Sequence, residues 1–498
     1  MPITLRALLV GIADALCVGS PLSPSDDGPM LLDAVHDSRS AGPGVLFCAL
    51  PGARTDGHDH AAAAVAAGSP ALLVERPLAL DVPQVVVPST RHALGPVASL
   101  VHGDPSAGCR VIGVTGTNGK TTTVALVEAA VAAAGLGSGV IGTTGARVHG
   151  AVVPNERTTP EATDLQRLLR SFVDRGVEVA AIEVSSHGLQ LRRIDGTQMA
   201  VAGFTMLGED HLDFHGDVAS YLAAKQRLFT PALTARAVVV VDDVAGRTVA
   251  AASQVPTVTL STGGGDADHR LVEVEVGLEG GRGVLVGPDG ATTALRTRLL
   301  GRHNLSNAAL AFVLATEAGV DAAAAAAGIA ACDGVSGRLE RVEVDGRVAL
   351  VDYAHTPDAI RIVVAELRRL LPVGGRLAVV VGAGGDRDTT KRAPMGAAAA
   401  AADLAVITSD NPRSEDPRAI VSAVADGADT AVLAGAPATV LREVDRRRAI
   451  AAAVAWAGPL DVILVAGKGH ELGQTFADRT DPFDDREVAR ALLSEGET

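Results

Sequence analysis

The segment VIGVTGTNGKTTT at residues 111–123 limits the possible folds of this chain more than any other feature. It has the pattern of an apolar strand, a glycine-rich turn and a helix that begins with Lys-Thr. Glycines allow a backbone to wrap a phosphate with its N–H groups, and a helix N-terminus adds positive potential. The segment therefore predicts a parallel α/β domain that binds a nucleotide.

The spacing of this loop departs from the commonest phosphate-loop pattern, GxxxxGK[ST]. Val114 stands where that pattern has its first glycine, and Gly113 and Gly116 flank it instead. The alternative is an ordinary glycine-rich turn, but the strand–loop–helix context favours a phosphate loop. We predict that Lys120 contacts the β- and γ-phosphates and that Thr121 holds Mg²⁺.

Length and charge set the broad class of protein. A chain of 498 residues with 47% hydrophobic residues can bury several cores, and about 150 residues per domain predicts three domains. The net charge of −15 argues against a nucleic-acid partner, because phosphate contacts supply most of the affinity of such proteins.

The N-terminus and the cysteines indicate the compartment. Leu5, Leu8, Leu9, Ile12 and Leu16 follow helical spacing, which predicts an amphipathic helix rather than a signal peptide. The four cysteines lack metal-ligand spacing and suit a reducing compartment. We expect a cytoplasmic protein without membrane insertion, because no apolar stretch is long enough to span a bilayer.

Lysine is rare in this chain. Only four lysines, Lys120, Lys225, Lys391 and Lys468, accompany 39 arginines, and each lies in a motif-like stretch. A lysine is a compact point charge that can be chemically modified, whereas an arginine keeps its charge. These lysines are therefore candidates for functions that arginine cannot perform.

Hydrophobic patterns divide the chain into three regions. Residues 1–105 carry short strand-like segments separated by turns, and residues 106–333 contain apolar strands at 110–117, 179–184 and 237–241. Alternating residues at 270–298 predict antiparallel hairpins, and 300–315 predicts a loop that enters a helix. Residues 334–498 alternate strands, at 348–351, 377–381, 404–407 and 462–465, with Ala-rich helices. We predict an α/β fold with three domains, the third of them Rossmann-like.

Two further segments carry candidate metal ligands. Glu183 ends an apolar strand, where parallel sheets place their ligand groups; the alternative is a strand-end glutamate that faces solvent. Asp210, His211, Asp213 and His215 form a dense cluster ahead of Lys225. Zinc is possible there, but Mg²⁺ fits better beside a phosphate loop and mainly oxygen donors.

Several motifs occur together and in order: GTNGKTT, TTPEATDLQ, EVSSHG, DHLDFHG, GRHNLSNA, VDYAHTPDA, GGDRD, SDNPR and AGKGHE, with DSRS at 37–40 and GARTDG at 52–57. Together they resemble the Mur ligases, specifically the MurE type, over nearly the whole chain. The resemblance implies an ATP- and Mg²⁺-dependent amide ligase that is a monomer. It would add meso-diaminopimelate to the uridine nucleotide UDP-MurNAc-L-Ala-D-Glu through an acyl phosphate, in peptidoglycan precursor synthesis.

The resemblance also implies roles for individual residues. Lys225 would be carbamylated by CO₂ and would hold the metal with Thr121, Glu183 and His211. The ATP site would comprise Gly116, Thr117, Asn118, Gly119, Lys120, Thr121, Thr122, Asn304, Arg338 and Asp352. The uridine substrate would contact Ser38, Ala53, Arg54, Thr55, Thr158, Thr159, Ser185 and Arg193. The amino acid would contact Arg387, Asp410, Asn411, Pro412, Arg413, Gly467 and Glu471, with Arg413 pairing with a distal carboxylate.

Three positions depart from the family pattern. Met206 replaces an asparagine that is usual before the DHLD cluster, Leu191 replaces a glutamine, and Ala393 replaces a proline. They leave open a paralogous ligase with another amine or acceptor, for example in secondary metabolism. A nucleotide-binding protein without catalysis and a folylpolyglutamate-synthase-like ligase would share part of the pattern. Lys225, Glu183 and His211 argue against the former, and DSRS and SDNPR against the latter.

Overall fold

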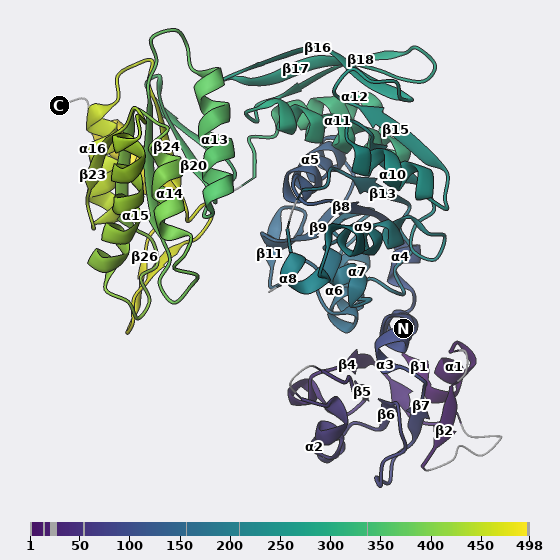
Figure 1. Cartoon of the computed structure of the whole chain (residues 1–498). Helices are drawn as coiled ribbons and strands as arrows, with labels where there is room; N and C mark the ends of the chain where they lie inside the picture. Colours follow the sequence, from purple (N-terminus) through teal and green to yellow (C-terminus); the bar gives the residue numbers. More distant parts are fainter. Residues whose placement is uncertain are drawn as a thin grey trace. The chain divides into compact units, whose positions relative to one another are not determined.

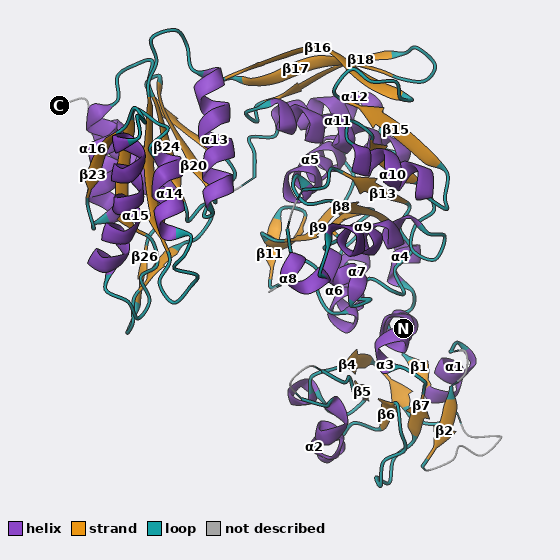
Figure 2. Cartoon of the chain, viewed as in Figure 1, coloured by secondary structure: helices purple, strands orange, loops and turns teal. Residues whose placement is uncertain are grey.

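The computed structural model describes residues 2–12, 15–19, 27–52, 55–155, 157–208, 210–335 and 337–495, without the side chains of Leu212 and Asp213. Strands and helices alternate along the chain and build three main sheets (Figures 1 and 2). The chain divides into two compact units, one with Met1–Glu273, Gly283–Leu295 and Ser306–Ala331, the other with the remainder. The predicted α/β class is confirmed, while the predicted domain boundaries near 105 and 333 stay predictions.

The first sheet, near the N-terminus, has five strands in the order β2-β7-β6-β5-β4. Strands β4 to β7 pair in parallel and β2 pairs antiparallel with β7. Alternate residues face opposite sides, so that Leu46 and Cys48 pack with α1 and α3 while Phe47 packs with α2. The bounds are β1 Ile3–Thr4, α1 Leu5–Val10, β2 Leu16–Val18, β3 Met30–Leu31, β4 Asp33–Val35, β5 Val45–Cys48, α2 Ala61–Ala66, β6 Ala71–Val74, β7 Gln84–Val86 and α3 Thr90–Val101.

Side chains of the first sheet contact the helix α6 (Ala162–Asp174) within the same unit. Arg167 donates from Nε to Asp33 at 2.9 Å, and the His36 ring lies 2.9 Å from the Thr163 hydroxyl. Ala162 packs into the apolar core of the first sheet. These contacts hold the short 3₁₀ segment Ser38–Ser40 close to the start of α6.

The second sheet carries eleven strands in the order β11-β10-β9-β12-β8-β13-β14-β15-β16-β17-β18. Strand β8 lies between β12 and β13 and is parallel to both, so the carboxyl ends of these three strands meet at one edge. The strands are β8 Arg110–Thr115, β9 Ser138–Gly142, β10 Gly145–Val148, β11 Ala151–Val153, β12 Val179–Glu183, β13 Val201–Phe204, β14 Ala237–Val240, β15 Thr257–Ser261, β16 His269–Gly277, β17 Gly280–Val286 and β18 Thr292–Thr297. The helices are α4 Pro105–Gly108, α5 Lys120–Ala133, α6, α7 Ser186–Gln190, α8 Leu212–His215, α9 Val218–Gln226, α10 Val244–Ala252, α11 Arg302–Glu317 and α12 Ala322–Ala331.

The third sheet has six strands in the order β19-β20-β24-β21-β22-β23. Val379 and Val381 pack with α13, α14 and α15, whereas Val380 packs with α16 and α17 on the opposite face, so helices cover both faces (Figure 2). The bounds are β19 Glu340–Val344, β20 Arg347–Asp352, α13 Pro357–Leu370, β21 Leu377–Ala383, α14 Arg392–Ala399, β22 Leu404–Ser409, α15 Pro417–Leu433, β23 Thr439–Arg442, α16 Arg446–Trp456, β24 Val462–Ala466, β25 Gly473–Thr475, β26 Thr480–Pro482 and α17 Asp485–Glu495.

A fully buried ion pair joins two strand ends of this third sheet. Arg446 donates from Nε and Nη2 to the two carboxylate oxygens of Asp485, each at 2.7 Å, and both side chains are inaccessible to solvent. The same guanidinium donates to the carbonyls of Ser409 and Ala466, the last residues of β22 and β24. The pair therefore fixes the points from which two loops leave the sheet.

Most predicted strands occur where the pattern placed them, but one prediction needs correction and one group of strands was not predicted. The predicted N-terminal helix ends at Val10, and Leu16 begins strand β2 instead, where it pairs with Val86. Strands β9, β10 and β11 form an antiparallel meander that the sequence pattern did not reveal. None of the described helices combines the length and apolar character needed to cross a membrane.

Asp485→Asn should destabilise the second unit by about 3–5 kcal/mol, because it leaves the Arg446 guanidinium buried without its counter-ion. Trp456 lies on α16 and is the only tryptophan of the chain, so urea unfolding followed by its fluorescence reports on this unit. The control Asp478→Asn removes an exposed partner of Arg479 and should cost less than about 1 kcal/mol. Equal stability of the two variants would contradict the assigned role of the buried pair.

Candidate active site

The phosphate loop connects β8 to α5 and requires glycine at two positions. Gly116 has φ +146° and Gly119 has φ +87°. A Cβ atom on Gly116 would lie 1.8 Å from the Thr205 hydroxyl, and one on Gly119 would lie 2.4 Å from Asn307 Oδ1. Gly116 leaves no room for a Cβ atom, and at Gly119 the left-handed φ would strain any larger residue.

Neighbouring segments hold the loop in place. The Thr117 N–H donates to the Met206 carbonyl at 2.8 Å, and the Thr205 hydroxyl donates to the Asn118 carbonyl at 2.6 Å. Lys120 Nζ donates to the carbonyls of Gly116 and Thr117, at 2.9 and 2.8 Å. The ammonium thus lies across the loop at the start of α5, where Thr121 and Thr122 form the first turn.

Glu183 is buried where β12 ends, which excludes the alternative of a solvent-facing glutamate. Its side chain is 1% exposed. One carboxylate oxygen accepts from the Thr121 hydroxyl at 2.9 Å, and the other accepts from the Thr143 N–H at 2.8 Å. Thr143 was not predicted, since no local pattern marks it. The carboxylate and the Thr121 hydroxyl place two oxygen donors beside the phosphate loop.

Lys225 lies on α9 with its side chain 1% exposed. Its Nζ donates to the Gly116 carbonyl at 2.9 Å and lies 4.3 Å from the centre of the Tyr221 ring. Burial, reinforced by the Lys120 cation, lowers the pKa of the Lys225 amine to about 6. The amine is therefore largely neutral near pH 7, the form in which it can act as a nucleophile.

His211 belongs to a group of packed rings near Tyr221. The His211 and His187 ring centres are 4.7 Å apart, and His187 stacks on Phe214 at 4.1 Å. His211 Nε2 lies 3.3 Å from Asp210 Oδ2, while the Asp213 side chain lies outside the described residues.

The donors near the loop suit Mg²⁺ better than zinc. Among the described side chains, no group of three or more His, Cys, Asp or Glu is arranged to hold a metal. The adjacent Thr121 and Glu183 oxygens match the preference of Mg²⁺ for hard oxygen donors.

Three of the residues predicted to contact the uridine substrate, Thr159, Ser185 and Arg193, lie close together beside the Glu161 carboxylate. Arg193 donates to this carboxylate at 2.9 Å and Arg91 at 2.7 Å. The Thr159 hydroxyl is 3.0 Å from the Ser185 hydroxyl and donates to the Glu183 carbonyl at 2.8 Å. Burial alone would raise the pKa of Glu161, but the charges of Arg193 and Arg91 outweigh it and hold that pKa below its usual range.

The other predicted contacts of the uridine substrate are more scattered. The Thr158 hydroxyl lies 3.0 Å from the Thr143 hydroxyl. Ser38 begins the 3₁₀ segment Ser38–Ser40, which the Asp37 side chain caps. Thr55 is exposed, whereas Ala53 and Arg54 lie outside the described residues.

Three predicted adenosine contacts belong to the second unit. Asn304 Nδ2 donates to the Leu300 carbonyl at 2.8 Å, and the Arg338 guanidinium lies 5.3 Å from the centre of the Tyr353 ring. Asp352 accepts from the N–H groups of Leu339 and Ala354, each at 2.8 Å, and burial raises its pKa. Their roles toward ATP stay predictions.

The residues predicted to bind the amino acid gather where β21, β22 and β24 end. Arg413 donates from Nη1 to the Gly385 carbonyl at 2.7 Å and adopts the left-handed φ of +51°. Such strain in a non-glycine residue is concentrated at functional sites. A Cβ atom on Gly384 would lie 3.0 Å from Arg413 Nη1 and 3.7 Å from Arg387 Cγ, so the two arginines flank this glycine.

Beside them, the motifs SDNPR and AGKGHE contact each other directly. Asn411 Nδ2 donates to Glu471 at 2.7 Å, and a Cβ atom on Gly467 would lie 2.5 Å from Asp410 Oδ2. Burial raises the pKa of Asp410. The structure thus brings Asp410, Asn411, Pro412, Arg413, Gly467 and Glu471 together, with Arg387 next to Arg413.

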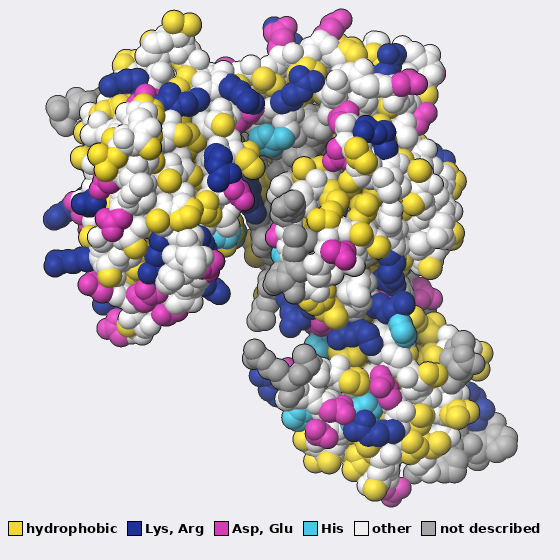
Figure 3. Space-filling view, in the orientation of Figure 1, with side chains coloured by type: hydrophobic (Ala, Val, Ile, Leu, Met, Phe, Trp, Pro, Cys, Tyr) yellow, Lys and Arg dark blue, Asp and Glu magenta, His cyan; other side chains and the backbone are white. Residues whose placement is uncertain are grey.

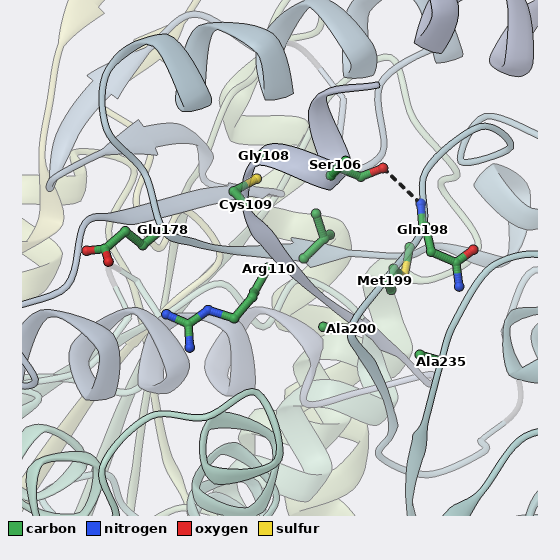
Figure 4. Close-up of a pocket in the computed structure, with 11 residues that line it drawn as sticks. Ser106, Gly108, Cys109, Arg110, Glu178, Gln198, Met199, Ala200 and Ala235 are labelled. Carbon is green, nitrogen blue, oxygen red and sulfur yellow. Dashed lines mark hydrogen bonds between the residues drawn. The ribbon is translucent and has the colours of Figure 1, made fainter. Parts of the chain in front are cut away.

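A separate cavity of about 440 Å³ lies at the opposite edge of the second sheet, where β8 and β13 begin. Figure 4 shows Arg110 and Glu178 on one side of it and the Ser106 hydroxyl, which accepts from the Gln198 N–H, on the other. None of the predicted site residues lines it, and parallel sheets bind their ligands at the carboxyl ends of strands.

On the face shown in Figure 3, cationic and anionic side chains are interspersed.

Comparisons with known proteins agree with the motifs. Three family models match: Mur ligase family, catalytic domain, at residues 35–102; Mur ligase middle domain at 114–315; and Mur ligase, glutamate ligase domain, at 337–469. A relative from Streptomyces coelicolor, named UDP-N-acetylmuramoyl-L-alanyl-D-glutamate--2,6-diaminopimelate ligase, is 46% identical over 97% of this chain and 96% of its own length.

Solved structures give the same result. A structure of a UDP-N-acetylmuramoyl-L-alanyl-D-glutamate--2,6-diaminopimelate ligase matches over 100% of both chains with a TM-score of 0.75 and 31% identity. A Mycobacterium tuberculosis folylpolyglutamate synthase matches 81% of this chain and 95% of its own with a TM-score of 0.60, but its 22% identity supports a common fold alone. The chain belongs to the Mur ligase family.

Proposed function

We propose that this chain is an ATP-dependent amide ligase that joins meso-diaminopimelate to UDP-MurNAc-L-Ala-D-Glu in peptidoglycan precursor synthesis. The full-length similarity to ligases with that name supports the substrates. The observation that carries the chemistry is the buried, largely neutral Lys225 amine 2.9 Å from the phosphate-loop carbonyl of Gly116, in the same unit as the Thr121–Glu183 oxygen pair.

The first step is phosphoryl transfer. An oxygen of the D-Glu γ-carboxylate attacks the γ-phosphorus of ATP, the bond to the β-phosphate oxygen breaks, and ADP leaves an acyl phosphate behind. The N–H groups of the loop from Gly116 to Thr122, with Lys120, stabilise the phosphate oxygens. Lys120 exchanges its loop carbonyl acceptors for those oxygens.

Mg²⁺ would be held by Thr121, Glu183, His211 and the modified Lys225. The fit rests on the 2.9 Å contact between the Thr121 hydroxyl and the Glu183 carboxylate, because hard oxygen ligands suit this ion. When bound, Mg²⁺ neutralises charge on the phosphates.

Lys225 supplies its ligand through carbamylation. The neutral amine attacks CO₂, a C–N bond forms, one proton is released, and the side chain becomes an anionic carbamate. A pKa of about 6 keeps the amine in the reactive form at neutral pH. A guanidinium holds its proton too tightly to react in this way, which explains a lysine in a chain rich in arginine.

Three sets of residues hold the UDP-linked substrate and ATP. Thr158, Thr159, Ser185 and Arg193 line the muramoyl-peptide channel, and Ser38, Ala53, Arg54 and Thr55 contact the uridine nucleotide. Asn304, Arg338 and Asp352 contact the adenosine and phosphates of ATP. The Glu161 carboxylate keeps the Arg193 guanidinium in position.

The second step is amide formation. The amine nitrogen of diaminopimelate attacks the acyl carbon, the bond to phosphate breaks, and the nitrogen loses a proton. Arg413 and Arg387 bind the distal carboxylate, because a guanidinium pairs with carboxylate in a bidentate way. Asp410, Glu471 and the backbone of Asn411, Pro412 and Gly467 receive the distal ammonium.

A second candidate is a paralogous Mur ligase with a different amine or acceptor. Met206 favours it, because it replaces the usual asparagine next to the phosphate loop. However, the Met206 carbonyl still accepts from the Thr117 N–H at 2.8 Å, so the loop keeps its anchor.

We also propose that the protein is cytoplasmic, since ATP and nucleotide-linked precursors are cytoplasmic substrates, and that it is a monomer.

Phosphate release from ATP should require both UDP-MurNAc-L-Ala-D-Glu and meso-diaminopimelate, and L-lysine should not replace the latter. The reason is that a lysine side chain would bring an ammonium toward Arg413. An assay with purified protein, each amine in turn and a control without amine measures this. Turnover with another amine alone would favour the second candidate, and no turnover with any amine would indicate nucleotide binding without catalysis.

Arg413→Ala should raise the KM for diaminopimelate about 10- to 100-fold, because a charge-assisted bidentate pair is lost. The KM for ATP should stay within about twofold. Arg418→Ala provides the control, since Arg418 is an exposed arginine at the start of the next helix. Unchanged diaminopimelate kinetics in Arg413→Ala would refute the assignment.

Lys225→Arg should lower kcat about 100-fold or more, as expected when a metal ligand is lost. With ¹³C-bicarbonate, NMR should detect a carbamate carbon in the wild type but not in this variant. The wild-type signal should fade as pH falls through about 6, because protonation removes the reactive amine. Lys391→Arg should keep both activity and signal. An active Lys225→Arg enzyme would rule out the carbamate.

A further inference from the structure

Lys468 is a buried lysine for which the proposed mechanism gives no role. It follows β24 directly, and its side chain is 0% exposed. The Arg446–Asp485 pair fixes the strand end beside it. Burying an ammonium is costly unless it is paired and hydrogen-bonded, so the surroundings of Lys468 must supply both.

Three oxygens from two loops surround the Lys468 ammonium. Nζ lies 3.0 Å from Asn411 Oδ1, 3.1 Å from Glu471 Oε2 and 3.9 Å from Asp410 Oδ1. An ammonium has three donors and no acceptor, so it donates to the Asn411 and Glu471 oxygens and forms a longer ion pair with Asp410. Two of these partners, Asp410 and Glu471, are the carboxylates proposed to receive the substrate ammonium, and the backbone of Asn411 belongs to the same pocket.

Lys468 also sets the orientation of Asn411. Because the ammonium only donates, it requires the amide oxygen on its side, and that oxygen also accepts from the Thr475 N–H at 2.9 Å. The amide nitrogen is thereby directed to Glu471 Oε2, 2.7 Å away. The Glu471 carboxylate is thus held by two donors in one position.

When all are ionised, Asp410 and the four charged groups that act most strongly on it carry one net negative charge. The carboxylates are Asp410, Glu471 and Asp485, and the cations are Lys468 and Arg446. One added cation, such as the ammonium of an amino acid, neutralises the group. Without Lys468 the same group would carry two net negative charges and would hold one carboxylate less firmly ionised.

We propose that Lys468 is a positioning residue of the amino-acid pocket, which orients Asn411 and Glu471 and keeps the pocket carboxylates ionised to receive a single substrate ammonium. This inference rests on the proposed function. The Lys468 ammonium does not contact the reacting atoms; it acts through the carboxylates that hold the distal ammonium of the substrate.

The groups around Asp410 and Glu471 determine how binding of the substrate ammonium should depend on pH when Lys468 is lost. Lys468, Arg446, Asp485, His470 and Tyr353 act on Asp410 and Glu471 or share charges with them, and Arg338 and Arg387 lie near Tyr353. Burial raises the pKa of Asp410, and the Lys468 and Arg446 cations oppose this. Loss of Lys468 therefore raises the pKa of Asp410 further, and it removes one of the groups that hold the pKa of Glu471 below its usual range. The protonated pocket then binds the ammonium poorly at low pH and recovers as pH rises.

Lys468→Met tests the proposal, since it removes the charge and keeps most of the side-chain length. At about pH 7.5 we expect the KM for meso-diaminopimelate to rise about tenfold, with the KM for ATP within about twofold. Between about pH 6.5 and about pH 8.5 the variant's KM should fall severalfold, while that of the wild type changes less than about twofold. The matched control is Lys391→Met, which should behave as the wild type.

A second variant covers the case in which Lys468→Met folds poorly. In Lys468→Ala, propylammonium should restore a low KM for diaminopimelate and propanol should not, because only the former supplies a cation. Equal effects of the two additives would overturn this inference but not the proposed function. The same holds for a diaminopimelate KM of Lys468→Met within twofold of that of an active wild type. An inactive wild type would instead refute the proposed function and the inference with it.

Discussion

The site of the first unit depends on the hydrogen bonds of the buried Glu183 carboxylate. It ends β12 inside the protein, where an unsatisfied carboxylate would be costly, and its oxygens are satisfied by Thr121 at the start of α5 and by Thr143 after β9. Its main-chain carbonyl accepts from Thr159. One buried residue therefore positions the phosphate-binding helix, the end of a neighbouring strand and the segment proposed to hold the peptide substrate.

In the second unit a buried cation, the Lys468 ammonium, has the role that the buried Glu183 carboxylate has in the first unit. Parallel strands end at one edge of the sheet, so the loops after β22 and β24, the two neighbours of β21, leave the sheet at the same edge. There the buried Lys468 ammonium serves oxygens from both loops, and Arg446 ties the two strand ends beneath them. In each unit a charge that is expensive to bury specifies the geometry, because only one arrangement satisfies its hydrogen bonds.

Local patterns predicted the elements that carry the site but not the contacts that hold it. Strand β8, the glycine turn and α5 follow from a continuous run of residues, as do the strand that ends at Glu183 and the motifs around Arg413. The prediction that Leu16 belongs to the N-terminal helix was wrong, because pairing with β7 outweighed its helical spacing. Thr205 against Gly116, and Asp485 with Arg446, join residues far apart in sequence, which no periodicity can reveal.

Two buried lysines show how surroundings select the chemistry of one residue type. Beside Lys225 lies another cation, Lys120, and burial lowers the Lys225 pKa to about 6, which leaves a neutral amine that can form a new bond. Beside Lys468 lie carboxylates at 3.1 and 3.9 Å, which stabilise a cation. Arginine could replace neither lysine, because it would keep its proton in the first site and its broad planar group does not match a compact set of three oxygens in the second.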